Sequence, residues 1–382
     1  MTSTSSIGII KNALRNNVSV MRSHLADSTI ISAVIKGNAY GHGVRVIVPV
    51  LEDIGISHFS VYSSAEAIVA QKAKNKKSTL MIMGFINSND YEWVIKNEIE
   101  FYVSEIDELN KAIKTAKSLS KKAIIHIDVE TGMNRTGLSL KELKKSIRIL
   151  NMNKEFLTIR GVCSHFAGAE SIANYTRIKK QFSVFKRRVK LLNQNDIYPE
   201  LKHIASTAAA INYPETSLDL VRTGILIYGY WPSRETFIFS LQKRKEKTDP
   251  LQRALFWNSH VIITKTVPEG EFIGYGMSYQ ASRQMKIMVI PVGYADGYSR
   301  SLSNNGHVLV DGHRSPVIGS VNMNMIICDI TDIPDVKIGD KVTLVGEQGD
   351  NEISFSSFAE MNQSLNYEIL ARLPENIERK LI

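Results

Sequence analysis

Lys36 closes an apolar run, directly after Val34 and Ile35, and a turn with three glycines follows it. An ammonium group at the end of a buried strand loses hydration, which disfavours its charged form and makes the amine a better Schiff-base nucleophile. The three glycines, within residues 37–43, suit a close approach of the backbone to a ligand. The alternative is a lysine that extends from a strand end into solvent. The composition of the turn favours a ligand site.

The elements that would position Lys36 are predicted from residues 10–235, where short apolar runs alternate with segments of helical periodicity. Eight strands separated by helices are typical of a (β/α)8 TIM-type barrel, whose catalytic groups gather at the carboxyl ends of the strands. A doubly wound open sheet is the alternative, but no glycine-rich dinucleotide-binding turn follows the first strand. The expected strands are Ile30–Ile35, Ser57–Val61, Thr79–Met83, Glu100–Val103, Ala123–Val129, Ile159–Cys163, Lys202–Ala205 and Leu218–Val221, and the clearest helices are Ser64–Ala73, Glu105–Ser118, Leu140–Asn151 and Tyr175–Gln194.

The pattern changes after the highly charged stretch 240–251, which contains Pro250. Short strands separated by turn signals then dominate, and they predict a second, mainly antiparallel β domain with one late helix near Ser356–Met361. We therefore expect a barrel domain over residues 1–240 and a β domain over residues 241–382. The expected strands of the second domain are Phe256–Thr266, Met285–Val292, His307–Val310, Ser315–Ser320, Met325–Ile330 and Lys341–Val345.

Composition and charge exclude several classes of protein. The net charge is +9, but the lysines and arginines are spread over amphipathic segments, and no nucleic-acid-binding motif is found. The two cysteines, Cys163 and Cys328, offer neither a disulfide framework nor a zinc ligand set. No apolar run approaches the roughly 18 residues that span a bilayer, and the first residues do not match a signal peptide. A cytoplasmic protein with no membrane and no nucleic-acid partner is expected.

Several motifs, in order, resemble those of the alanine racemase family, pyridoxal-phosphate enzymes with a barrel followed by a β domain. The string AVIKGNAYGHG (residues 33–43) resembles the cofactor-lysine motif of that family. The similarity extends from about residue 7 to 372. The other matching strings are IDVETGMNRTGL (127–138), CSHFAGAE (163–170), HIASTAAAINYPETSLDLVRTGILIYG (203–229), IGYGMSYQA (273–281), VIPVGYADGYSR (289–300), IGSVNMNM (318–325) and LNYEI (365–369).

The resemblance implies a two-base racemisation of L- and D-alanine that supplies D-alanine for peptidoglycan. Lys36 would carry the cofactor, pyridoxal 5'-phosphate, and exchange protons on one face of the substrate. Tyr275, from a second subunit of a homodimer, would act on the opposite face. Arg222 would meet the pyridine nitrogen, and His165 would hold Arg222 and Tyr275 in place.

The remaining matched residues would bind phosphate and substrate. Arg135 would lie near the substrate carboxylate, and the backbone of Met323 would face the same group. Hydroxyl and amide groups at strand ends and helix starts suit a phosphate. The implied phosphate ligands are Tyr40, Thr207, Gly224, Ile225 and Tyr367.

The sequence departs from the family pattern at several positions. Asp128 stands where many relatives have a carbamylated lysine, and it could orient Arg135 through its own carboxylate. Ser206 replaces a usual asparagine before the phosphate hydroxyl. Asn322-Met323-Asn324 replaces the commoner Cys-Met-Asp, and Ser320 replaces an arginine that often lines the substrate entrance. Substrate specificity and rate are the properties that these departures affect.

Three alternatives stay open at this point. A serine or broad-specificity racemase shares nearly all of the motifs, although Tyr367 leaves little room and favours alanine. A decarboxylase of the same architecture would need a glycine-rich phosphate loop and a catalytic cysteine in the β domain, and neither is found. A cofactor carrier built from the barrel alone would lack residues 250–382.

Overall fold

The computed structural model of the chain describes residues 4–75, 77–242, 244–355, 358 and 366–382. The chain forms two compact units, each made of separate segments. The barrel unit comprises residues 13–36 and 47–252, and the β unit comprises residues 1–12, 37–46 and 253–382. The chain therefore passes from the barrel unit to the β unit directly after Lys36. The division of the chain at residue 240 stays a prediction.

Eight parallel strands form a nearly closed barrel, which confirms the expected fold class. The first and last residues of each strand lie within two residues of the positions expected from the sequence. Between the last two neighbours, the amide of Asp219 donates to the carbonyl of Lys202 and that of Arg222 to the carbonyl of Ala205, both at 3.1 Å. In spatial order the strands are β8 (Leu201–His203), β7 (Leu157–Cys163), β6 (Ala123–Asp128), β5 (Glu100–Val103), β4 (Thr79–Ile82), β3 (His58–Val61), β2 (Ile30–Val34) and β9 (Leu220–Thr223).

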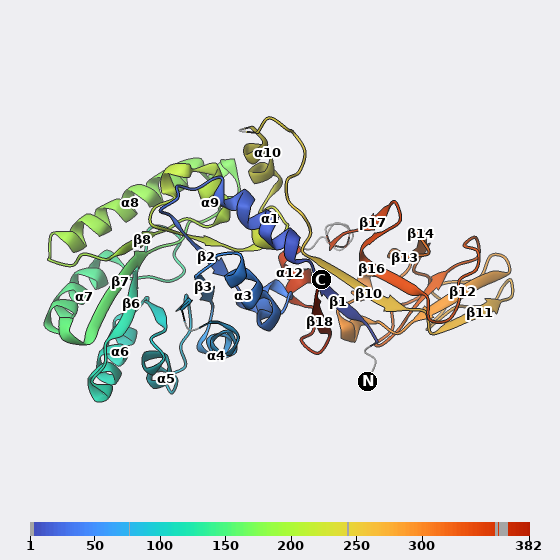
Figure 1. Cartoon of the computed structure of the whole chain (residues 1–382), viewed down its shortest axis with the longest axis horizontal. Helices are drawn as coiled ribbons and strands as arrows, with labels where there is room; N and C mark the ends of the chain where they lie inside the picture. The colour runs from blue at the N-terminus through green and yellow to red at the C-terminus, as the bar shows by residue number, and fades with distance from the viewer. Residues whose placement is uncertain (1–3, 76, 243, 356–357, 359–365) are drawn as a thin grey trace. The chain divides into compact units, whose positions relative to one another are not determined.

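The helices of the barrel unit follow the strands along the chain and cover the outer face of the sheet (Figure 1). Local signals mark the starts of some of these helices. At the start of α7, Ser139 and Glu142 form a reciprocal capping box, with the Ser139 amide donating to the Glu142 carboxylate at 2.9 Å. The helices are α1 (Lys11–Arg22), α3 (Val44–Asp53), α4 (Ser64–Ala73), α5 (Tyr91–Lys96), α6 (Ile106–Leu119), α7 (Leu140–Met152), α8 (Tyr175–Asn193), α9 (Thr207–Asn212) and α10 (Arg234–Gln242), of which α1 and α3 also include residues of the β unit.

The β unit is mainly antiparallel, as expected, and holds two sheets. The larger sheet has the order β14 (His313–Pro316), β13 (His307–Val310), β16 (Lys341–Gln348), β10 (Leu255–His260), β1 (Ser6–Ile9) and β18 (Glu378–Leu381), with β17 (Asn351–Ile353) paired to β16. The smaller sheet has the order β11 (Ile263–Val267), β12 (Met285–Ile290) and β15 (Ile326–Asp329), and a short helix, α12 (Asn366–Ala371), lies near the end of the chain.

Several features of the β unit differ from the sequence-based expectation. The strand expected at Ser315–Ser320 lies earlier, as β14 (His313–Pro316), because it pairs with β13 across a tight turn. The apolar run Phe256–Thr266, expected as one strand, forms β10 and β11 in different sheets, because Val261 bonds to Asp340 whereas Ile262 bonds to Val289. Strand β1, from the first residues of the chain, pairs with β10 and β18. The expected late helix at Ser356–Met361 lies mostly outside the described residues. Within those residues, no helix is long and apolar enough to cross a membrane.

Candidate active site

Lys36 lies two residues after the end of β2, at the carboxyl end of a barrel strand. Its side chain is exposed, yet its pKa is lowered, first by partial desolvation and then by the positive charge of Arg135; Glu66 opposes the shift and Arg222 adds to it. A lowered pKa increases the fraction of neutral amine at a given pH. The amine is therefore chemically suited to act as a nucleophile and a base.

The segment after Lys36, labelled α2 (Lys36–Tyr40), is a left-handed turn. The φ angles of Asn38, Ala39 and Tyr40 lie between 51° and 55°, a region that costs non-glycine residues roughly 1–2 kcal/mol each. Hydrogen bonds hold the turn: the amides of Gly41 and Gly43 donate to the carbonyls of Gly37 and Asn38, both at 2.9 Å. Strain of this kind persists only where surrounding contacts fix the backbone.

Contacts within the β unit fix this turn. The Tyr40 ring lies against the Tyr367 ring, with centroids 5.9 Å apart. The carbonyl of Gly41 accepts two hydrogen bonds from the Arg379 guanidinium, at 2.9 and 3.2 Å. A Cβ on Gly41 would lie 2.0 Å from the Leu370 carbonyl oxygen. The end of the chain therefore supports the turn that follows the lysine.

Arg222, on β9, is buried and bonded on several sides within the barrel unit. Its guanidinium donates to the carbonyls of Ser164 (2.7 Å) and Ile204 (3.1 Å), to His203 Nδ1 (2.7 Å) and to His165 Nδ1 (3.2 Å). Because arginine can only donate, both imidazole Nδ1 atoms must be unprotonated acceptors. The structure thus brings Arg222 and His165 together, as the resemblance implied.

His165 is held neutral by its surroundings. Its pKa is lowered to about 3, first by burial and then by the charges of Arg222, Arg135 and Lys36. Since its Nδ1 accepts from Arg222, the proton of the neutral ring is on Nε2. His165 is therefore a hydrogen-bond donor through Nε2.

Arg135 is exposed on the loop after β6. Among the described residues, no ion pair joins it to Asp128. The Asp128 carboxylate instead accepts from Ser104 (3.1 Å) and Thr136 (3.0 Å), and burial raises its pKa against the effect of these hydrogen bonds. Asp128 thus restrains the loop through Thr136, the residue after Arg135, and not through the direct contact with Arg135 that the sequence left open.

The expected phosphate ligands of the barrel unit lie at neighbouring strand ends. Thr207 begins α9 just after β8, and its hydroxyl accepts a hydrogen bond from the Gly224 amide at 3.2 Å. Gly224 and Ile225 follow β9. The Thr207 hydroxyl and the Ile225 amide therefore lie where two strands end, beside the Gly224 amide that bonds to that hydroxyl, an arrangement that suits an anion.

Tyr275 and Met323 lie on exposed loops of the β unit. Tyr275, between two glycines with positive φ, is 76% exposed, and Met323 is 56% exposed. The Met323 carbonyl accepts from the Ala295 amide at 2.9 Å. A Cβ on Gly293 would come within 2.4 Å of the Met323 carbonyl oxygen, so this loop packs tightly against the Gly293 backbone.

The predicted site residues thus fall into two sets, one in each unit. Lys36, Arg135, His165, Arg222 and the phosphate ligands Thr207, Gly224 and Ile225 belong to the barrel unit. Tyr40, Tyr275, Met323 and Tyr367 belong to the β unit.

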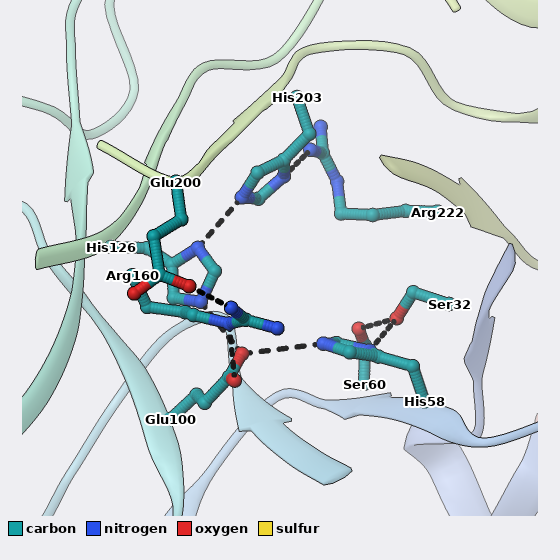
Figure 2. A network of polar contacts seen from close by, with 9 residues as sticks. All are labelled: Ser32, His58, Ser60, Glu100, His126, Arg160, Glu200, His203 and Arg222. Carbon is teal, nitrogen blue, oxygen red and sulfur yellow. Dashed lines mark hydrogen bonds and ion pairs between the residues drawn. The ribbon is translucent and has the colours of Figure 1, made fainter. Parts of the chain in front are cut away.

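A polar network inside the barrel, which Figure 2 shows, was not predicted from the sequence. His203, bonded to Arg222, is joined through His126 to the buried carboxylate of Glu100. The available signal was a charged or imidazole residue within otherwise apolar strands, at positions where alternation points the side chain inward.

Comparison with known proteins identifies this arrangement. Residues 9–232 match the family model of the alanine racemase N-terminal domain, and residues 254–381 match that of the C-terminal domain. The chain belongs to the alanine racemase family. The expectation of an enzyme of the isomerase class is thereby confirmed.

Individual alanine racemases align along almost the whole chain. The alanine racemase of Clostridium perfringens is 36% identical, with 96% of this chain and 92% of that protein aligned. The crystal structure of alanine racemase from Bacillus anthracis with bound L-Ala-P is similar with a TM-score of 0.90 at 30% identity, covering 100% of this chain and 96% of that one. The alanine racemase from Bartonella henselae with covalently bound pyridoxal phosphate has a TM-score of 0.84 at 27% identity, with both chains fully covered.

The turn after Lys36 generates a test of stability. Gly41→Ala should lower the free energy of unfolding by about 2–4 kcal/mol, because it adds left-handed strain and a clash with Leu370. Gly270→Ala is the control, since its φ is also positive but no atom lies within 4 Å of the added Cβ. Urea unfolding of both variants measures the difference, and equal losses would show that the contact with Leu370 is unimportant.

Proposed function

We propose that this enzyme racemises alanine with pyridoxal 5'-phosphate, using Lys36 and Tyr275 as the two bases. The proposal rests above all on Lys36, which ends a barrel strand with a lowered pKa under the influence of Arg135 and Arg222. The names of the related proteins support alanine as substrate, and the name of the Bartonella henselae structure supports the cofactor. D-alanine supply for peptidoglycan and a cytoplasmic location stay predictions.

The residues present fit pyridoxal phosphate. The lowered pKa of Lys36 suits attack on the aldehyde, and the Thr207 hydroxyl, bonded to the Gly224 amide, together with the Ile225 amide suits the phosphate. By resemblance, Tyr40 and Tyr367, whose rings lie together, join the phosphate ligands. The guanidinium of Arg222 offers donors for a pyridine nitrogen.

The proposed chemistry needs a base on each face of the α-carbon. When bound, pyridoxal phosphate supplies the electron sink that makes the α-proton acidic. Lys36 Nζ removes or returns the proton on one face, and Tyr275 Oη does so on the other. In one direction the lysine accepts and the tyrosine donates, and in the other direction these roles exchange.

Arg222 and His165 would tune this chemistry without transferring protons. A guanidinium does not release its proton near neutral pH, so a ring nitrogen that accepts from Arg222 stays unprotonated, which limits how strongly the ring withdraws electrons. That restraint would disfavour side reactions such as transamination. His165, neutral with its proton on Nε2, would donate to Tyr275 as the resemblance implies.

The exposure of Tyr275 is the feature that favours a homodimer. Its side chain is 76% exposed in the single chain, although an acid–base group works best where water is excluded. In the proposed head-to-tail homodimer, Tyr275 of each subunit would complete the site of the other. Arg135 and the Met323 backbone would bind the substrate carboxylate.

The reaction itself is the first test of this function. Incubation with L-alanine in deuterated water should yield D-alanine with deuterium at the α-carbon, because each turnover exchanges that proton. Chiral analysis with mass detection measures both properties, and L-serine is run in parallel. Faster conversion of serine than alanine would replace the proposed substrate, and conversion of neither would refute the proposed function.

Borohydride reduction tests Lys36 directly. Reduction of the protein with bound cofactor should fix pyridoxal phosphate to Lys36, since its amine is the group with the lowered pKa at a strand end. Peptide mapping by mass spectrometry locates the adduct. Lys74→Ala, which removes another lysine of lowered pKa, is the control and should leave the adduct in place. An adduct on another lysine would refute the assignment.

Subunit complementation tests the shared site. Lys36→Ala and Tyr275→Phe should each lower kcat by roughly 10²–10⁴-fold, because each removes one acid–base group. When the two variants are mixed under conditions that exchange subunits, activity should return, since one of the two sites in each mixed dimer keeps both residues. Mixed dimers verified by mass that remain inactive would place both residues of one site on a single chain.

A further inference from the structure

We propose that Glu100, acting through His126 and His203, is a positioning residue that fixes the Arg222 guanidinium. The inference rests on the proposed function insofar as that function gives Arg222 a role at the cofactor ring. The hydrogen-bonded chain itself lies wholly within the barrel unit, and Figure 2 shows its course from Arg222 to Glu100.

The chain has three links of ordinary length. Arg222 bonds to His203 Nδ1 at 2.7 Å, His203 Nε2 to His126 Nδ1 at 2.9 Å, and His126 Nε2 to Glu100 Oε2 at 2.8 Å. Both histidines are fully buried, and Arg222 and Glu100 are 5% and 4% exposed. The four residues come from β9, β8, β6 and β5, so the chain crosses the barrel interior.

The chemistry of the two ends sets one direction for all three bonds. Arginine can only donate, and an ionised carboxylate can only accept. His203 must therefore accept through Nδ1 and donate through Nε2, and His126 must do the same. Burial, the main cause, lowers the pKa of both histidines and keeps them neutral, each with a single proton on Nε2.

Glu100 is ionised at its end of the chain. Burial acts to raise its pKa, but the hydrogen bonds donated by His126 and His58 outweigh burial and lower it. Arg160 also donates to the other carboxylate oxygen at 3.2 Å, and Arg160 in turn pairs with Glu200 nearer the surface. Glu100 is thus held as an acceptor from three sides.

A defined consequence follows for Arg222. If the acceptor at Glu100 were lost, His126 could take its proton on Nδ1, and His203 would then carry its proton on Nδ1, facing the donor of Arg222. Two opposed donors would push the guanidinium away from its present position. The chain does not relay protons, because the arginine end does not release one. Its effect is to hold an orientation.

The neighbouring strand β7, between β6 and β8, leaves room for this hydrogen-bonded chain. Gly161, on β7, lies beside His126, and a Cβ there would be 2.1 Å from His126 Nδ1. The φ angle of Gly161 is not in the left-handed region, so the conflict is only steric. A buried ion network often contributes little to stability. We therefore assign this network a functional role, the positioning of Arg222.

The test uses two variants that disturb the chain from different sides. Glu100→Gln replaces a group that can only accept with an amide that can present either a donor or an acceptor to His126, so the direction of the bonds is no longer fixed. Gly161→Ala displaces the His126 ring while leaving Glu100 unchanged. Both should lower kcat roughly ten- to hundredfold, the cost of losing a hydrogen bond to a charged group, with KM for alanine near the wild-type value. Both should also shift the absorption band of the bound cofactor. Glu215→Gln, which removes an exposed carboxylate paired with Lys179, is the control and should change neither property.

Nitrogen-15 NMR of the cofactor-free protein gives a readout apart from activity. Wild-type His126 and His203 should each show a protonated Nε2 and an acceptor Nδ1. In Glu100→Gln and Gly161→Ala, the His203 Nδ1 signal should move, although neither residue contacts His203, while the control should leave it in place. A wild-type His203 protonated on Nδ1 would overturn the proposal, even if the variants failed to fold.

A double-mutant comparison measures the coupling between Glu100 and Arg222. If Glu100 acts through Arg222, Glu100→Gln should lower kcat much less in an Arg222→Lys background than in the wild type. Additive losses would assign Glu100 an independent, structural role. If the wild-type protein does not racemise alanine, the proposed function is refuted. If the wild-type protein is a racemase but Glu100→Gln has the same kcat and absorption band as Glu215→Gln, only this inference is refuted.

Discussion

The buried guanidinium of Arg222 imposes the constraint on which the barrel interior depends. A group that can only donate must be surrounded by acceptors, and the strand ends provide them as two carbonyls and two imidazole nitrogens. Those contacts determine the proton positions of His165 and His203, because each must present a bare Nδ1. The polar interior differs from the layers of branched apolar side chains that usually fill such barrels.

The parts of this structure that the sequence predicted are those governed by local pattern. All eight barrel strands and the four helices named from the sequence follow from apolar runs and helical periodicity, and the helix Ser64–Ala73 has the expected limits. The end position of Lys36 followed from the same pattern. Motif resemblance, rather than periodicity, singled out Arg222 and His165, and the contact between these two residues is present in the structure.

The parts that were missed depend on contacts between distant segments. Nothing local marks residues 6–9 as a strand of the second sheet, because the partners of that strand lie about 250 residues away or more. The sequence left open whether Asp128 orients Arg135, and the contact of its carboxylate with Ser104 depends on a neighbouring strand end. The pairing of Glu100 with His126 likewise depends on barrel register, which single-strand periodicity does not fix.

The parallel pairing of β1 with β18 has a consequence for the order of events during synthesis. All barrel strands are complete once residue 223 has been made, whereas β1, among the earliest segments made, pairs with the last four-residue strand of the chain. The turn after Lys36 depends on the same late segment, through Leu370, Tyr367 and Arg379. A chain whose synthesis stops before residues 367–381 would therefore have its barrel strands complete and its lysine turn unsupported, so a segment translated after the whole barrel determines whether the turn beside the catalytic lysine is properly formed.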